Sequence, residues 1–306
     1  MRGFIGIGVA ILVLGAPLQA QSGPAAIVIR VEGEVAVTHG ETPAAPASVG
    51  ERMFVGDVVI PTDGARAILV TGSGAQQIVT ERTTIAEPRA GASSDLFDRA
   101  VATLAQAANT NTSTGGRQGM IRPIPGQTSL VAPRNELTVA NARPTFRWTA
   151  TPGESYDLML RRVEGGRPML FEIGSDTAWT LPDSVPDLEA GSTYQWTVFV
   201  GGRRGGRAMQ PQTFRVIGLE ESVELADYLD QIEVFGLDPE RDGLFLTVVA
   251  YRDMGLFYAA RDALDEVERE ASLSWELYRL KGEILAEIGR EEEARAAFDR
   301  ADELMP

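Results

Sequence analysis

The fold of the C-terminal part is decided by two stretches, LFLTVVAYRDMGLFYAARDAL (residues 244–264) and YRLKGEILAEIGREEEARAAF (residues 278–298). They align at a spacing of 34 residues, which places Gly255 over Gly289 and Ala260 over Ala294. Apolar residues recur at helical spacing on both sides of each glycine, so each stretch predicts two helices joined by a sharp turn. Glycine permits the turn, and the small alanines permit the two helices to approach closely.

This unit resembles the tetratricopeptide repeat. In the second copy, the small, glycine, alanine, aromatic, alanine and proline positions of the family pattern fall on Gly282, Gly289, Ala294, Phe298, Ala301 and Pro306. The first copy keeps Tyr251, Gly255, Ala260 and Leu264, but has Val248 at the early small position. The resemblance implies a helical domain over residues 220–306. Because two units rarely suffice for such a fold, a preceding helix near residues 222–236 is expected to cover an exposed face.

The same resemblance implies a binding groove formed by the first helices of the repeats. Its lining positions fall on Phe245, Val249, Arg252, Asp253, Glu276, Arg279, Glu283, Ala286 and Glu287. A mixed apolar and charged lining suits a peptide or a protein helix, so these are the expected partner-binding residues.

Residues 25–88 read as short, β-branched strands separated by glycine turns, which predicts an all-β module. Gly33-Glu34-Val35, Gly50 and Val55-Gly56-Asp57-Val58-Val59, followed by an alternating strand, occur in the order found in the FecR-type domain of bacterial envelope proteins. The resemblance implies a sensing or binding module, with a glycan or peptide as a possible ligand. The sequence shows neither the anti-sigma segment nor the membrane span of that family's signalling members, so transmembrane signalling by this chain alone is not expected.

Residues 94–108 change to a helical period, with Leu96, Phe97, Ala100, Val101, Leu104 and Ala108 on one face. We expect this helix to pack on the β module and to complete a domain over residues 25–108. Residues 109–129 are rich in threonine, asparagine and glycine without an apolar period, so they are predicted to be a linker.

Residues 130–217 carry a second β pattern, in which large apolar and polar side chains alternate. Phe146-Arg147-Trp148 and the segment 188–196 resemble core strands of fibronectin type III and related immunoglobulin-like domains. The resemblance implies a β-sandwich. Because such folds serve many functions, it indicates no more specific role than a spacer or a binding module.

The first twenty residues read as a secretory signal. Arg2 precedes an apolar run from Phe4 to Leu14, and Ala20 precedes a polar glutamine, so we predict cleavage after Ala20. An uncleaved N-terminal anchor is the alternative. No other stretch approaches the ~20 apolar residues that a membrane span needs, so no stable span is expected in the mature chain. The chain has no cysteine and hence no disulfide, which favours a bacterial periplasmic or secreted protein.

The negative charge is concentrated at one end. Residues 219–306 carry 24 acidic and 9 basic side chains, whereas residues 1–218 carry 19 of each. An acidic module repels phosphate, so nucleic acid and anionic lipid surfaces are not expected as partners.

Few residues offer catalytic chemistry. His39 is the sole histidine, and without cysteine there is no thiol nucleophile and no zinc-thiolate site. We therefore predict that the protein is not an enzyme and has no catalytic residue, metal site or cofactor.

One segment copies part of a metal-binding motif. Asp238, Glu240 and Asp242 precede Gly243 as in the first half of a calcium loop, but Val249 stands where the bidentate glutamate is needed. We interpret the segment as a solvated turn with Asp242 as the N-cap of the next helix.

Together these patterns predict a multidomain β + α protein with a FecR-like β domain, an immunoglobulin-like sandwich and tetratricopeptide hairpins. The favoured function is a periplasmic binding or scaffold protein that mediates interactions with proteins or glycans. The alternative is a sensor or regulatory subunit that acts through a separate membrane partner.

Overall fold

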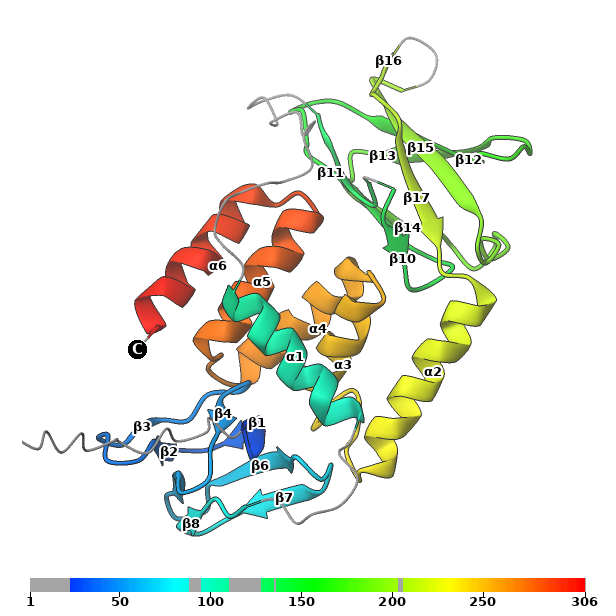
Figure 1. Ribbon diagram of the computed structural model, residues 1–306. Helices are drawn as coiled ribbons and strands as arrows, with labels where there is room; N and C mark the ends of the chain where they lie inside the picture. Colours follow the sequence, from blue (N-terminus) through cyan, green and yellow to red (C-terminus); the bar gives the residue numbers. More distant parts are fainter. Residues whose placement is uncertain (1–22, 88–94, 110–127, 135, 203–205, 306) are drawn as a thin grey trace, which may run out of the picture.

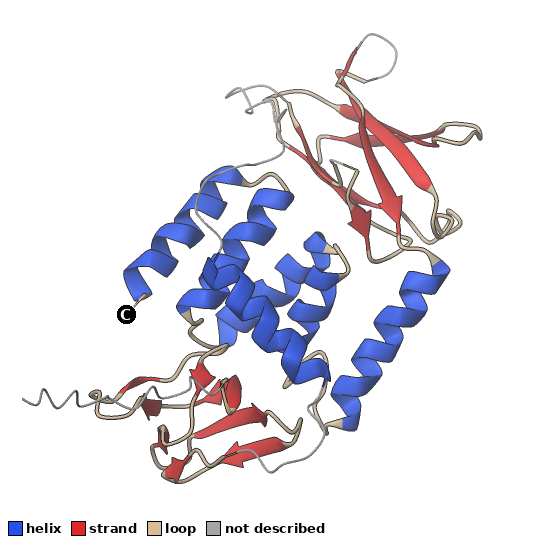
Figure 2. Cartoon of the chain, in the orientation of Figure 1, coloured by secondary structure: helices blue, strands red, loops and turns tan. Residues whose placement is uncertain are grey.

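The computed structural model describes residues 23–87, 95–109, 128–134, 136–202 and 206–305. Within these ranges the strands form two β modules, and six helices lie between them (Figures 1 and 2). The protein is thus a β + α chain with mixed sheets and a helical layer. The predicted signal sequence and residues 110–127 of the predicted linker lie outside the described residues.

The first β module contains two four-stranded antiparallel sheets, ordered β4-β1-β6-β7 and β3-β2-β5-β8. Their inner faces share a core that includes Val28, Met53, Val59 and Leu69, each fully buried. The strands are β1 (Ala26–Glu32), β2 (Val35–Thr38), β3 (Ala45–Pro46), β4 (Arg52–Met53), β5 (Val58–Pro61), β6 (Arg66–Thr71), β7 (Gln76–Val79) and β8 (Thr83–Thr84).

The second β module packs a sheet ordered β10-β17-β15-β12-β13, with β16 paired to β15, on the sheet β14-β11-β9. Phe146 and Trp196 meet edge to face at 5.0 Å between ring centroids, and both are fully buried. The aromatic core therefore forms where large residues alternate along the strands. The strands are β9 (Leu130–Ala132), β10 (Thr138–Val139), β11 (Thr145–Trp148), β12 (Tyr156–Arg162), β13 (Met169–Gly174), β14 (Ala178–Thr180), β15 (Thr193–Val200), β16 (Arg207–Ala208) and β17 (Gln212–Val216).

The helical layer is built from two hairpins, α3–α4 and α5–α6, at the 34-residue spacing read from the sequence. Gly255 and Gly289 turn the chain within them, at φ +70° and +77°, conformations that favour glycine. The helices are α3 (Leu244–Asp253), α4 (Phe257–Glu270), α5 (Trp275–Glu287) and α6 (Glu291–Leu304).

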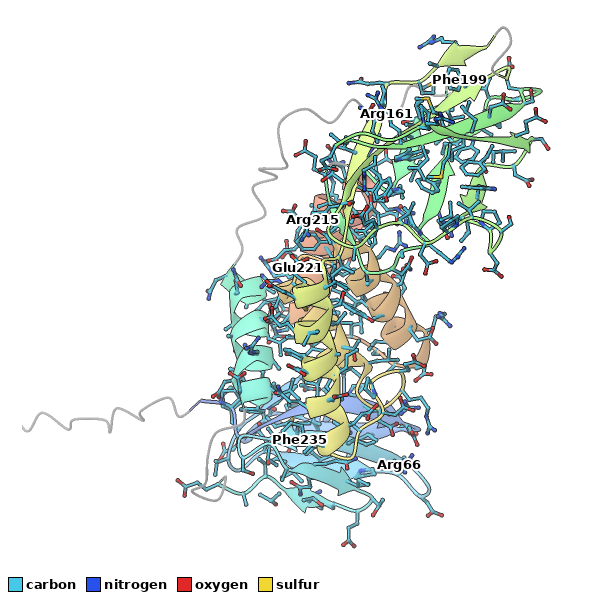
Figure 3. All side chains as sticks on the ribbon, turned by 90° about the vertical axis from the view of Figure 1, so that its right-hand side faces the viewer. Arg66, Arg161, Phe199, Arg215, Glu221 and Phe235 are labelled. Carbon is cyan, nitrogen blue, oxygen red and sulfur yellow. The ribbon has the colours of Figure 1, made fainter. Side chains whose placement is uncertain are left out.

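The helix α2 (Leu219–Val234) runs from the second β module toward the first (Figure 3). At its upper end Glu221 pairs with Arg215 of β17, and Phe235 follows its lower end. It packs against α3, as expected for a helix that precedes the hairpins. Among the helices of the described ranges, none combines the length and the apolar composition that a membrane span needs.

Two local expectations are corrected. The N-cap of α3 is Gly243, whereas Asp242 forms an ion pair with Arg30 of β1 at 3.2 Å. The helix α1 (Asp95–Asn109) packs chiefly against α5 and α3, and it shares a core cluster with apolar residues of β1 and β6 of the first β module. It therefore belongs to the helical layer (Figure 1).

Candidate functional site

The predicted groove face of α3 and α5 is occupied by a helix of the same chain. Phe245 and Val249 of α3 are both 0% exposed, and they belong to one apolar cluster with residues of α1 and α5. The α1 helix contacts α5 and α3 (Figure 1). These two lining residues are therefore closed to solvent and to any further ligand while α1 is in place.

The α1 helix is amphipathic and packs against α5 and α3. Its buried side chains are Leu96, Phe97, Ala100, Thr103, Leu104 and Ala107. Asp95 and Asp98 lie in its first turn, where carboxylates stabilise a helix N-terminus. At the other end the Asn109 side-chain amide donates to the Ala105 carbonyl at 2.8 Å. The residues at its two ends thus stabilise α1 as a helix, and its apolar side chains pack it against α5 and α3.

A polar rim borders the apolar contact. Arg252 donates from Nη2 to Gln106 Oε1 of α1 at 2.9 Å, and its guanidinium also lies 3.2 Å from Asp253 and 3.7 Å from Glu283. From α1, the Arg99 guanidinium lies 5.5 Å from the ring centroid of Tyr228 of α2. Arg252 is therefore the group of this face that donates a hydrogen bond to the polar side of α1.

The other predicted lining residues are placed differently. Glu276 is 4% exposed and accepts two hydrogen bonds from Arg52 of the first β module, at 2.9 and 3.2 Å. Arg279 donates to Asp302 of α6 at 2.8 Å, and Ala286 packs against an apolar cluster around Leu285. Glu287 is half-buried. The structure thus brings Phe245, Val249, Arg252, Asp253 and Glu283 to the α1 side, while Glu276 joins two modules.

A second polar cluster in the first β module surrounds His39. Its Nδ1 lies 2.7 Å from Asp57 Oδ2 and its Nε2 lies 2.9 Å from Glu51 Oε1. Both carboxylates also accept backbone N–H groups, Glu51 from Ser48 and Asp57 from Phe54. Donation of a hydrogen bond from the protonated His39 ring to Glu51, and of a second one to Asp57, outweighs desolvation and raises the pKa of His39 to about 9. At neutral pH the ring is an imidazolium without a free lone pair, so it is not poised as a general base.

This cluster predicts a pH-dependent stability. Because the folded-state pKa is raised above 6.5, the contribution of His39 is fully present below pH 6.5 and is lost as pH rises through about 9. The side chain is 41% exposed, so screening reduces the effect to about 1–2 kcal/mol. Urea unfolding should show His39→Gln less stable than wild type by that amount at pH 6, with the difference closing above pH 9. A difference independent of pH would contradict the assignment.

A cavity of about 310 Å³ lies between the second β module and the helical layer. Its walls combine apolar groups with both signs of charge: Val131, Ala132, Arg147, Tyr258, Arg261, Asp262, Asp265, Ile288 and Arg290. Arg134 joins the second β module to the helical layer, because its backbone N–H donates to Tyr258 Oη at 3.1 Å and its Nη2–H donates to the Gly289 carbonyl at 2.8 Å. Within the described ranges, no group of three or more histidine, aspartate or glutamate side chains is arranged to hold a metal ion.

Comparison with known proteins assigns no family. No family model matches the chain, and no curated protein matches it. The anti-sigma factor sensor domain of RsgI4 from Pseudobacteroides cellulosolvens is similar at 15% identity and a TM-score of 0.21, over 30% of this chain and 76% of that one.

Fibronectin domains give similarities of the same order. The FN1-FN3 domains of chicken CNTN1 align at 11% identity and a TM-score of 0.24, over 64% of this chain and 55% of that one. A two-domain fibronectin type III segment of chicken tenascin aligns at 13% identity and a TM-score of 0.19, over 63% of this chain and 93% of that one. Scores this low carry no information about function.

Proposed function

We propose that this chain is a non-catalytic binding or scaffold protein of the cell envelope whose α3/α5 face, the surface formed by Phe245, Val249, Arg252, Asp253 and Glu283, holds an amphipathic helix of an envelope protein. One observation carries the proposal: an amphipathic helix, α1, is seated on that face in this structure. Helix-in-groove recognition uses an apolar stripe for affinity and bordering charges for orientation, and the face offers both.

The joints between the modules support a scaffold role. Val49 of the first β module donates its N–H to the Ser272 carbonyl and accepts from the Ser274 N–H, each at 2.9 Å, at the entry to α5. Gly50, at φ +82°, lies so close that an added Cβ would stand 2.6 Å from Leu277 Cγ. Leu137 of the second β module packs among Leu285, Ile288 and Phe298. Modules joined by backbone bonds and close packing keep their outer surfaces at fixed separations.

The envelope location follows from the predicted signal sequence and the absence of cysteine from the sequence. The FecR-like and tetratricopeptide resemblances belong to this proposal as well. They favour a peptide or glycan on the first β module and a protein helix on the helical layer. The alternative role as a sensor subunit with a separate membrane partner predicts that deletion of the gene changes transcription under envelope stress, whereas a scaffold leaves the transcript profile unchanged.

Site-specific crosslinking in envelope fractions tests the binding face. A photo-crosslinking amino acid in place of Asp253, which is exposed beside Arg252, should capture a partner. The same amino acid in place of Arg295, exposed on α6, is the matched control. We expect at least ~10-fold more adduct from position 253, because photo-crosslinking requires direct contact with the partner. Equal capture from both positions, or none from 253, would move the function away from this face.

A further inference from the structure

We infer that α1 competes with the partner for the α3/α5 face. The partner is an amphipathic helix with the side-chain pattern of α1, and it binds by displacing α1 from that face. The inference rests on the proposed function and adds the regulation of the site and the character of its ligand. That ligand is an amphipathic helix of about four turns with large apolar residues at the spacing of Leu96, Phe97 and Leu104. It has a small residue at the position of Ala100 and a side-chain acceptor at that of Gln106.

The first step concerns how α1 is attached. Within the described residues, no backbone–backbone hydrogen bond joins α1 to another element. Its contacts include the apolar groups of the shared cluster, the Gln106–Arg252 hydrogen bond and the Arg99–Tyr228 contact. A second helix that presents the same side chains can reproduce these contacts, because the apolar cluster, the Gln106–Arg252 hydrogen bond and the Arg99–Tyr228 contact are all made by side chains.

The second step concerns the covalent connections of α1. The helices within each hairpin are joined by three residues, 254–256 and 288–290. In contrast, ten residues separate the end of β8 at Thr84 from α1, and twenty separate α1 from β9 at Leu130. By length of chain, α1 is therefore connected to its neighbouring strands less tightly than the hairpin helices are connected to each other.

The third step concerns what departure of α1 exposes. Phe245 and Val249, now 0% exposed, would face water together with neighbouring apolar groups of α5. Burying an apolar side chain is worth about 1.5–3 kcal/mol, so the open face is unfavourable unless another apolar helix covers it. Only molecules in which α1 has left the face can bind the partner. The apparent affinity is therefore the intrinsic affinity multiplied by the fraction of molecules with α1 undocked.

A synthetic peptide of residues 95–109 provides the probe, and the full chain provides the receptor. Ala100→Glu places a carboxylate at a residue that is 0% exposed under α1, and Ala102→Glu makes the same change on the exposed side of the helix. We expect the Ala100→Glu chain to bind the labelled peptide at least ~10-fold more tightly than wild type or Ala102→Glu. A peptide that itself carries Ala100→Glu should not bind any of them.

Equal binding by all three folded chains would overturn the inference and make α1 a fixed part of the core. If Ala100→Glu does not fold, amide hydrogen exchange of wild type decides: α1 amides should exchange at least ~10-fold faster than those of α3, because α1 opens alone. Equal protection of the two helices would overturn it. Partner capture from position 253 without release of α1 would overturn the inference and limit the proposed binding face to its exposed edge at Asp253, whereas peptide binding without an envelope partner would leave the displacement of α1 standing and count against the proposed function.

Discussion

Replacing Arg52 with alanine is expected to lower the free energy of unfolding by about 3–5 kcal/mol, because it leaves a carboxylate buried without its partner. Arg52 donates from Nε and Nη2 to Glu276 Oε1 at 3.2 and 2.9 Å, and the Glu276 side chain is only 6% exposed. The pair crosses from β4 to α5, beside the backbone bonds of Val49. The loss should therefore appear as weaker docking of the first β module on the helical layer. Urea unfolding followed by circular dichroism measures it.

Two further variants make this result interpretable. Arg147→Ala removes an exposed arginine that has no ion pair with any described residue, and should cost less than about 0.5 kcal/mol. Glu276→Gln added to Arg52→Ala should recover part of the loss, because the buried charge is gone. If Arg52→Ala alone costs less than about 1 kcal/mol, or if Glu276→Gln brings no recovery, the ion pair does not hold the modules together. Glu276 would then be available to a partner, as the sequence predicted.

Phe245→Ala is the second change with a large expected effect, a loss of about 3–5 kcal/mol in the free energy of unfolding. The Phe245 side chain is among the largest fully buried ones, and it lies in the cluster shared by α1, α3 and α5. Truncation removes its apolar contacts and leaves a cavity that the two hairpins cannot readily close. Since Phe245 shares this apolar cluster with Leu96, Phe97 and Leu104 of α1, the α1 amides should also lose protection in hydrogen exchange.

Phe54→Ala is the matched control for this substitution, because Phe54 lies in the first β module and is 40% exposed. It should cost less than about 1 kcal/mol and leave α1 protection unchanged. A Phe245→Ala protein as stable as the Phe54→Ala protein would show that Phe245 of α3 does not contribute to the apolar packing against α1. Equal loss of protection in α1 and α6 would show that the two helices open together with the whole layer.

Much of the architecture was predictable from local patterns. The 34-residue spacing of Gly255 and Gly289 determined two helical hairpins, because a glycine turn between apolar helical faces permits little else. Alternating aromatics such as Phe146, Trp148 and Trp196 determined a sandwich core. In the candidate site, the tetratricopeptide resemblance assigned Phe245, Val249, Arg252, Asp253 and Glu283 to one groove face, and in the structure they lie on the side of α3 and α5 that meets α1. Their role in binding a partner stays a prediction.

The sequence by itself thus determined which segments are helices and strands and which of their faces are buried. Only the tertiary structure decided what covers each face. The α1 stripe fits the first β module and the α3/α5 face equally well as a pattern, and packing chose the latter. Arg52 and Glu276 are 224 residues apart, and His39 meets Glu51 and Asp57 across separate turns. Periodicity is a local property of the chain, whereas these contacts depend on how whole modules dock, and no local pattern records that.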